Sequence, residues 1–284
     1  LTNWPEMNPK FPSKNLFYLW RLRLLLQELF DRVALQFGRK FDHLFSQKHA
    51  PRTSILIPTL PGRVELLKGR AIPSILAQGD QDFEVLVVTD TFSFEVEEAL
   101  KHLDPRFRYL WGARIPRSLS KADAASRWCS AATPALNLAL KSSNGLYIAR
   151  LDDDDSWDSD HLEKSVGALR ETGAEFVSSA TVLPDNTQSP SYRADDPYYG
   201  PTSGSKHPPV ALGSPITWIY ARHLRHIRYS LWSWRLPHNR PADINLSLRF
   251  WKAGVEMRYL ERVGAYLGLR KNQLEWGLKA FLED

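Results

Sequence analysis

The chain has 284 residues, of which 43% are hydrophobic and 24% charged, and this is the composition of an ordinary globular protein. A formal net charge of +5 and a pI of about 9.2 suit an anionic ligand or an anionic membrane surface. The absence of zinc-finger spacing and of a dense basic run argues against nucleic acid. The single cysteine, Cys129, excludes an internal disulfide and fits a reducing compartment such as the cytoplasm.

Residues 1–50 form an N-terminal extension in which residues 15–45 predict an amphipathic helix. Apolar side chains recur along it at spacings of three and four, and they are Leu19, Leu22, Leu26, Leu29, Val33, Phe37, Phe41 and Leu44. One interpretation is that this stripe packs on the remainder of the chain or on a second subunit of an oligomer. Because five basic residues accompany the stripe, the other is peripheral contact with an anionic membrane.

Strands and helices alternate from residue 51 onward. We expect strands at 54–57, 83–88, 107–111, 146–151 and 176–182, and helices at 64–78, 94–103, 133–141 and 161–171. Pro73 should interrupt the first of these helices. Thr133 should cap the third, and Asp160 with Glu163 should cap the fourth. This alternation predicts an α/β fold with a mostly parallel, doubly wound sheet flanked by helices.

The last hundred residues are less regular. Residues 184–215 are rich in Pro, Ser, Gly and Tyr and predict a long loop, of the kind that binds ligands or covers a site. A strand is expected at 215–220, a helix from Asp243 to Ala253 that Gly254 ends, and a last strand at 257–260.

Four consecutive aspartates, Asp152 to Asp155, follow the apolar run 146–151. Adjacent carboxylates repel one another, so a cation is needed to hold them together, and Mg²⁺ or Mn²⁺ prefers such oxygen ligands. In an extended segment Asp152 and Asp154 point the same way, which predicts a D-x-D pair for one metal ion. An EF-hand calcium loop does not fit, because Trp157 stands where that loop needs glycine.

Other polar residues end the neighbouring strands. Pro58 and Thr59 follow the first strand and Asp90 follows the second. Since ligands of doubly wound sheets bind beyond the carboxyl ends of the strands, these residues and the aspartates predict one site. The chain lacks a Walker A sequence, a G-x-G-x-x-G turn, an H-E-x-x-H pair and a G-x-S-x-G elbow, which excludes the sites that these motifs build.

The order and spacing of these segments resemble the inverting GT-A glycosyltransferases of family 2. The resemblance covers roughly residues 52–260 and is carried by Ser54–Thr59, Ala71–Gln78, Phe83–Asp90, Asn137, Gly145–Ile148, Leu151–Trp157 and Ala242–Arg249. It implies a GT-A, Rossmann-like fold behind the N-terminal helical extension. Residues 51–183 would be the nucleotide-sugar-binding half, and residues 184–284 the acceptor-binding half with the catalytic base and a C-terminal helix.

The resemblance also implies roles for single residues. The donor would be bound by Pro58, Thr59, Arg63, Asp90, Asn137, Asp152 and Asp153. Pro58, Thr59 and Asp90 would surround the base and ribose, and Arg63 would assist the diphosphate. Asp152 and Asp154 would hold Mn²⁺ or Mg²⁺, and Asp243 would be the catalytic base.

The implied activity is metal-dependent, inverting transfer of a hexose-type sugar from a UDP, GDP or TDP donor to a hydroxyl group. The acceptor would be a glycan, a lipid-linked molecule or a small molecule in glycan or polysaccharide biosynthesis, in the cytoplasm or at the inner face of a membrane. Residues 184–215 and 232–239 would form the acceptor pocket.

Two other classes of function remain open. A nucleotidyltransferase or metal phosphohydrolase could use the same acidic cluster, although the basic glycine-rich loop of nucleotidyltransferases is reduced here to Pro61-Gly62-Arg63. A non-catalytic module that binds carbohydrate or a partner would account for the high aromatic content, 12% of the residues, and for the amphipathic extension.

Overall fold

A computed structural model describes residues 14–45, 51–115, 120, 127, 129–183, 192–193, 211–233 and 241–268. The helical segments are α1 (Lys14–Phe41), η1 (Asp42–Phe45), α2 (Val64–Leu66), η2 (Leu67–Ala71), α3 (Ile72–Leu76), α4 (Phe94–Leu100), α7 (Thr133–Ser142), α8 (His161–Thr172), η3 (Pro215–Thr217), η4 (Arg222–His226) and α9 (Ala242–Ala253). The strands are β1 (Thr53–Pro58), β2 (Phe83–Val88), β3 (Phe107–Leu110), β4 (Tyr147–Arg150), β5 (Ser156–Trp157), β6 (Phe176–Val182), β7 (Tyr192–Arg193), β8 (Ala211–Leu212), β9 (Ile219–Ala221) and β10 (Met257–Tyr266).

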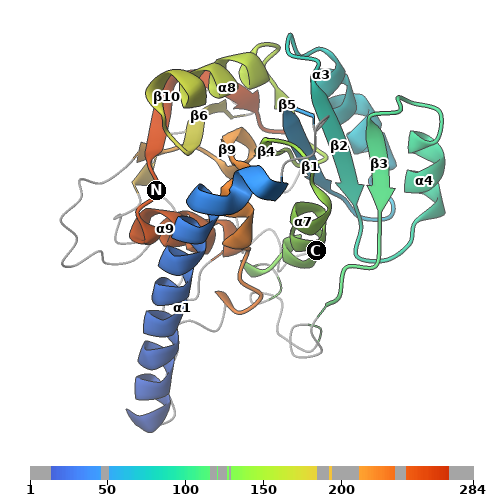
Figure 1. Ribbon diagram of the computed structural model, residues 1–284. Coiled ribbons are helices and arrows are strands. Elements are labelled where there is room, and N and C mark those ends of the chain that lie inside the picture. The colour runs from blue at the N-terminus through green and yellow to red at the C-terminus, as the bar shows by residue number, and fades with distance from the viewer. Residues whose placement is uncertain are drawn as a thin grey trace.

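Eight strands form one sheet in the order β3-β2-β1-β4-β9-β6-β10-β5 (Figure 1). Strands β3, β2, β1 and β4 run parallel, β9 runs antiparallel to both of its neighbours, and β6 pairs in parallel with β10. The predicted α/β class and mostly parallel sheet are confirmed. Because β9 and β10 join strands β1 to β6, both predicted halves of the chain contribute to one sheet, and the boundary between them stays a prediction.

Both faces of the sheet are buried. Along β1 and β2, Ile55 and Val85 point into one apolar cluster while Leu56 and Leu86 point into the other, as the alternation of a strand requires. The first cluster packs against α3, α4 and α8, and the second against α1, α7 and α9. Strands covered on both faces read as continuous apolar runs, which explains why the sequence pattern locates them well.

Proline and glycine residues shape several of the helices. The predicted helix at 64–78 is interrupted, because a π-type turn, η2, separates α2 from α3 immediately before Pro73. Gly254 ends α9 in the left-handed conformation, with φ of 92°, as predicted. Gly38 lies within α1, where a Cβ would be 2.8 Å from the carbonyl oxygen of His223, so the lack of a side chain permits close packing.

Two predicted helix caps are wrong. The N-cap of α7 is Ala132 in the left-handed region, with φ of 58°, and the hydroxyl of Thr133 is buried without a hydrogen bond. Asp160 precedes α8 without capping it, because its carboxylate forms an ion pair with Arg262. For Asp160, a contact with another part of the fold therefore replaces the local hydrogen bond that the motif offers.

The face of α1 that contacts the remainder of the protein is not the predicted apolar stripe. Leu35 is fully buried, whereas Leu22, Leu26, Leu29 and Val33 of the predicted stripe are each more than half exposed. The expectation that the stripe packs on the remainder of the chain is therefore wrong. Figure 1 shows α1 alongside α9, with its N-terminal half extending beyond the body.

Candidate active site

The four aspartates form a turn and do not continue the strand. Strand β4 ends at Arg150, and Leu151 still donates its backbone N–H to Leu56. The backbone then turns, so that the N–H of Asp155 lies 3.3 Å from the carbonyl oxygen of Asp152. Asp153, Asp154 and Asp155 are buried in this acidic turn. Buried carboxylates need hydrogen-bond or charge partners, and each of the three has one.

Arg63 and Thr59 hold the middle of the acidic turn. The Thr59 hydroxyl donates to Oδ2 of Asp153 over 2.6 Å, and Nη2 of Arg63 donates to Oδ1 over 2.5 Å. The same Nη2 lies 3.0 Å from Oδ2 of Asp154. Asp153 and Asp154 thus share one guanidinium. The segment is a turn and not the extended strand from which the pairing of Asp152 with Asp154 was predicted, so that pairing stays a prediction.

Gly268 closes the acidic turn from the carboxyl end of β10. Its backbone N–H donates to Oδ1 of Asp155 over 2.8 Å. A Cβ at this position would lie 1.8 Å from the carbonyl oxygen of Asp154, so only glycine permits the approach. Burial raises the pKa of Asp155 well above its usual range, and the neighbouring aspartates add to the effect. Burial likewise raises the pKa of Asp153 to about 6, although Thr59 and Arg63 oppose the change.

Arg150 lies between Asp152 and Asp243. Its Nε and Nη2 bind the two carboxylate oxygens of Asp152 over 2.9 and 3.1 Å, and its Nη1 lies 3.9 Å from Oδ2 of Asp243. Burial opposes the charged form of Arg150, but the attraction of Asp152 and other neighbours outweighs it, so the pKa of Arg150 is raised. The tertiary fold therefore brings the first turn of α9 to the end of β4.

The carboxylate of Asp243 is partly exposed to solvent although most of the side chain is buried. Its side chain is 25% exposed, and Oδ1 accepts a hydrogen bond from the backbone N–H of Ile244 over 2.7 Å. Burial raises the pKa of Asp243, and Arg150 opposes the increase. Tyr229 is buried in the same group of residues, where burial raises the pKa of its hydroxyl. A carboxylate with a raised pKa that still reaches solvent is suited to accept a proton.

Asp90 follows β2 at the same edge of the sheet. Its Oδ1 is buried and has no hydrogen-bond partner, and burial raises its pKa. The hydroxyl of Tyr109 holds the adjoining loop, because it lies 2.7 Å from Thr89 Oγ1 and accepts a hydrogen bond from the backbone N–H of Ser93. A carboxylate oxygen without a partner in a fixed loop is a candidate ligand-binding atom.

The remaining predicted donor residues border this site. Pro58 ends β1 and pairs with Val88 in register, so Pro58 and Thr59 lie beside the end of β2. Asn137 lies on α7, where its amide donates to the carbonyl oxygen of Tyr229 over 2.9 Å and its own oxygen has no partner. Of the predicted acceptor pocket, residues 184–191, 194–210 and 234–239 lie outside the described part of the chain.

Three residues of the site escaped the sequence-based prediction, namely Arg150, Tyr229 and Gly268. A charged residue within an apolar strand was a usable signal for Arg150, since a buried charge requires a partner. Tyr229 and Gly268 gave no local signal, because their importance depends on which segments they meet.

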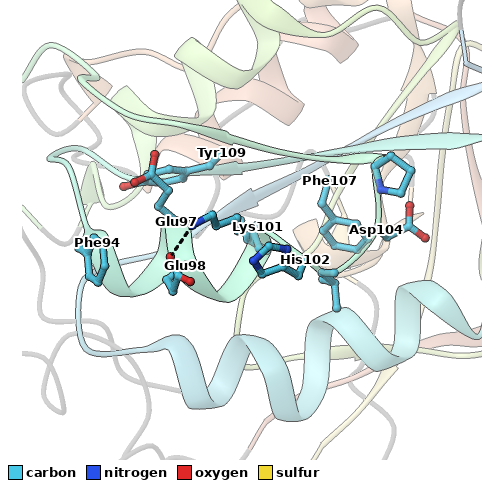
Figure 2. Close-up of a pocket in the computed structure, with 11 residues that line it drawn as sticks. Phe94, Glu97, Glu98, Lys101, His102, Asp104, Phe107 and Tyr109 are labelled. Atoms are coloured by element: carbon cyan, nitrogen blue, oxygen red, sulfur yellow. Dashed lines mark hydrogen bonds and ion pairs between the residues drawn. The ribbon is translucent and has the colours of Figure 1, made fainter.

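A separate hollow of about 690 Å³ lies between α4 and β3 (Figure 2). Glu98 and Lys101 form an ion pair in its wall, and Tyr109 and Phe107 line the side that faces the sheet. None of its lining residues belongs to the acidic turn or to α9, although Tyr109 also contacts the loop that carries Asp90.

Comparison with known proteins agrees with this geometry. The family model described as Glycosyl transferase family 2 matches residues 127–228, which include Arg150 and the acidic turn. No curated protein sequence matches significantly. The chain resembles the crystal structure of S. aureus TarS with a TM-score of 0.54 and 14% identity, over 78% of this chain and 38% of that chain.

Two ligand complexes have the same fold. S. aureus TarS 1-349 in complex with UDP gives a TM-score of 0.54 and 14% identity over 78% of this chain and 62% of the other. The mannosyltransferase PcManGT from Pyrobaculum calidifontis, in complex with GDP-Man and Mn²⁺, gives a TM-score of 0.52 and 16% identity over 89% of this chain and 69% of the other.

The chain thus spans 38% of the full TarS chain and somewhat under two thirds of the shorter form. The predicted resemblance to family 2 glycosyltransferases and the GT-A fold are confirmed, and glycosyltransferase is the enzyme class that the matched family model indicates.

Proposed function

We propose that this chain transfers a sugar from a nucleotide diphosphate to a hydroxyl group of an acceptor, with inversion at the anomeric carbon. The observation that carries the proposal is the position of Arg150, which holds Asp152 of the acidic turn and lies 3.9 Å from Asp243. Donor-side and acceptor-side carboxylates therefore border one space at the carboxyl edge of the sheet, in a GT-A fold.

The donor is proposed to lie over the ends of β1, β2 and β4. The unpartnered oxygen of Asp90 and the nearby Thr59 suit hydroxyl and N–H groups of a nucleoside, and Arg63 suits the diphosphate. The relatives bind UDP, UDP-GlcNAc and GDP-Man, so a UDP, GDP or TDP sugar is the donor class that we propose.

A divalent cation fits the acidic turn when the donor completes its coordination. Among the described residues, no group of three or more His, Cys, Asp or Glu side chains is arranged to hold a metal ion. Mg²⁺ and Mn²⁺ sites with nucleotides need only one or two carboxylates, since phosphate oxygens and water fill the other positions. Asp152 and Asp154 would supply these carboxylates, after Arg63 moves from Asp154 to the diphosphate. When bound, Mn²⁺ or Mg²⁺ neutralises charge on the departing diphosphate.

Asp243 is proposed to accept the proton of the acceptor hydroxyl. As that oxygen bonds to the anomeric carbon, the bond from this carbon to the diphosphate breaks, and the nucleoside diphosphate leaves with the bonding electrons. The raised pKa of Asp243 makes it a stronger base, while Arg150 keeps it ionised and oriented. Arg150 is thus a positioning residue.

Two substitutions separate donor binding from turnover. Asp154→Ala should abolish the metal-dependent part of donor binding, measured by calorimetry with and without Mn²⁺. Asp243→Asn should leave donor binding intact and lower turnover roughly a hundredfold or more. Asp82→Asn, at an exposed carboxylate outside the site, is the matched control and should alter neither. Metal-dependent binding that survives in the Asp154 variant would refute the cation site, and a fully active Asp243 variant would refute the base.

The products distinguish the other classes of function. Sugar transfer releases a nucleoside diphosphate and yields a glycosylated acceptor. A nucleotidyltransferase would release pyrophosphate, a phosphohydrolase would release phosphate, and a binding module would release nothing from any donor. Chromatography of the products with a panel of nucleotide sugars and acceptors, including lipid-linked ones, therefore tests the reaction class directly.

A further inference from the structure

The outward face of α1 is apolar over most of its length. Six large side chains on it, Leu19, Leu22, Leu26, Leu29, Val33 and Phe37, are between 49% and 62% exposed. A surface helix ordinarily turns such a stripe toward the core and its polar side chains toward water. Contiguous exposed apolar surface of this extent marks an interaction site.

The polar face of α1 fixes this orientation. Asp31 is buried and receives two hydrogen bonds from Arg249 of α9, over 2.6 and 2.7 Å. Arg39 donates hydrogen bonds of 2.6 and 2.7 Å to the two carboxylate oxygens of Glu175, and Gly38 lies against the backbone of His223. Rotation of the helix to hide its apolar face would break these ion pairs, so the face stays outward.

The charges of α1 are distributed unevenly between its two sides. Both acidic residues are held by the body of the protein, Glu28 by Lys252 and Asp31 by Arg249. The cations Arg21, Arg23, Arg32 and Lys40 are exposed. Two of them also contact the body of the protein, because Arg23 lies over the ring of Trp232 and Arg32 donates to the carbonyl oxygen of Lys252. Exposed cations therefore accompany the apolar side chains of α1, while both of its carboxylates are paired with the body.

We propose that α1 lies on an anionic membrane surface, with its apolar face in the headgroup region and its cations against lipid phosphates. Exposed cations beside an apolar face complement anionic headgroups, whereas in a pair of identical chains they would face each other. None of the described helices has the length and apolar composition to cross a membrane.

This docking brings the candidate site close to the membrane surface. Arg249 and Lys252, which anchor α1, lie on α9, and Asp243 is in the first turn of the same helix. A helix of this length spans about 18 Å. The inference does not depend on the sugar-transfer reaction, because its test uses lipid alone.

Vesicle co-sedimentation tests the proposal. The wild-type chain should sediment with phosphatidylcholine vesicles that contain phosphatidylglycerol, less with pure phosphatidylcholine, and less at high salt. The double variant Leu26→Glu and Leu29→Glu should bind the anionic vesicles roughly tenfold or more weakly, because it removes apolar area and adds like charge. Phe94→Glu on α4, where the ring is 67% exposed, is the matched control and should bind like the wild type.

Each contrary result has a clear meaning. Wild-type protein that stays in the supernatant with every vesicle overturns the proposal, and so does a double variant that binds as tightly as the wild type. Light scattering after gel filtration tests the alternative that a second copy of the chain binds the apolar face of α1. A dimer that the double variant dissociates, without vesicle binding, assigns the face to a second copy and also overturns it. Since both leucines are exposed, circular dichroism should show unchanged folding of the variant.

Discussion

The ion pair that fastens α1 to the sheet should make the stability of the fold depend on acid pH. Glu175 precedes β6, and both of its oxygens bind Arg39, while Oε1 also lies 2.8 Å from Nε2 of His223. Burial opposes ionisation of Glu175, but the hydrogen bonds from Arg39 and His223 outweigh it and lower its pKa to about 2. We predict that Glu175→Gln destabilises the protein at neutral pH and has a smaller effect in acid.

The size of the effect follows from the two pKa values. The difference between the ordinary 4.5 and about 2 corresponds to about 3 kcal/mol of unfolding free energy. Arg39 is one-third exposed, so solvent screening reduces the expected loss to about 2–3 kcal/mol. Because the pKa is lowered in the folded state, the stabilisation is complete above pH 4.5 and is lost as the pH falls toward 2.

Urea unfolding of the wild type and of Glu175→Gln, near neutral pH and near pH 3, measures the loss of unfolding free energy and its dependence on pH. The gap between the two proteins should be about 2–3 kcal/mol at neutral pH and narrow to about 1 kcal/mol near pH 3. Glu98→Gln, which removes an exposed ion pair with Lys101, should cost under about 1 kcal/mol. A gap for Glu175→Gln that is independent of pH, or absent at neutral pH, would refute the argument.

Three further substitutions test other parts of the structure. Asp31→Asn should cost about 3 kcal/mol in urea unfolding, because it removes a fully buried carboxylate and leaves the largely buried Arg249 without its charge partner. Glu28→Gln on the same helix should cost under about 1 kcal/mol, and equal losses would contradict the difference in burial. Gly268→Ala places a Cβ against the carbonyl oxygen of Asp154, so it should lower the melting temperature and weaken donor binding, and wild-type values for both would argue against a rigid turn. Arg150→Met should lower turnover strongly while Arg150→Lys restores part of it, and an active methionine variant would rule out the positioning role.

Local patterns in the sequence predicted most of the scaffold. Runs rich in apolar residues located β1, β2, β4 and β6, because strands buried on both faces have few polar positions. Pro73 and Gly254 acted where predicted, since their backbone constraints are intrinsic to the residue. The strand-end positions of Asp90 and of the four aspartates followed from the same periodicity.

Two errors arose because a distant partner competed with a local motif. Asp160 could cap α8 but pairs with Arg262, and the aspartates could alternate in a strand but bend so that Asp153 and Asp154 share Arg63. The energy of such a pairing depends on the distance between segments that are remote in the sequence. Periodicity and capping patterns contain no information on that distance.

The sequence by itself determined the α/β class, the order of most elements and the edge of the sheet at which polar residues gather, because these depend on residue type and on spacing within short segments. Only the tertiary structure decided that Arg150 joins Asp152 to the first turn of α9, that Gly268 closes the acidic turn, and that α1 turns its leucines outward. The physical reason is that each of these features is a contact between segments far apart in the chain, and the amphipathic pattern of α1 specifies two faces without specifying which one meets the protein.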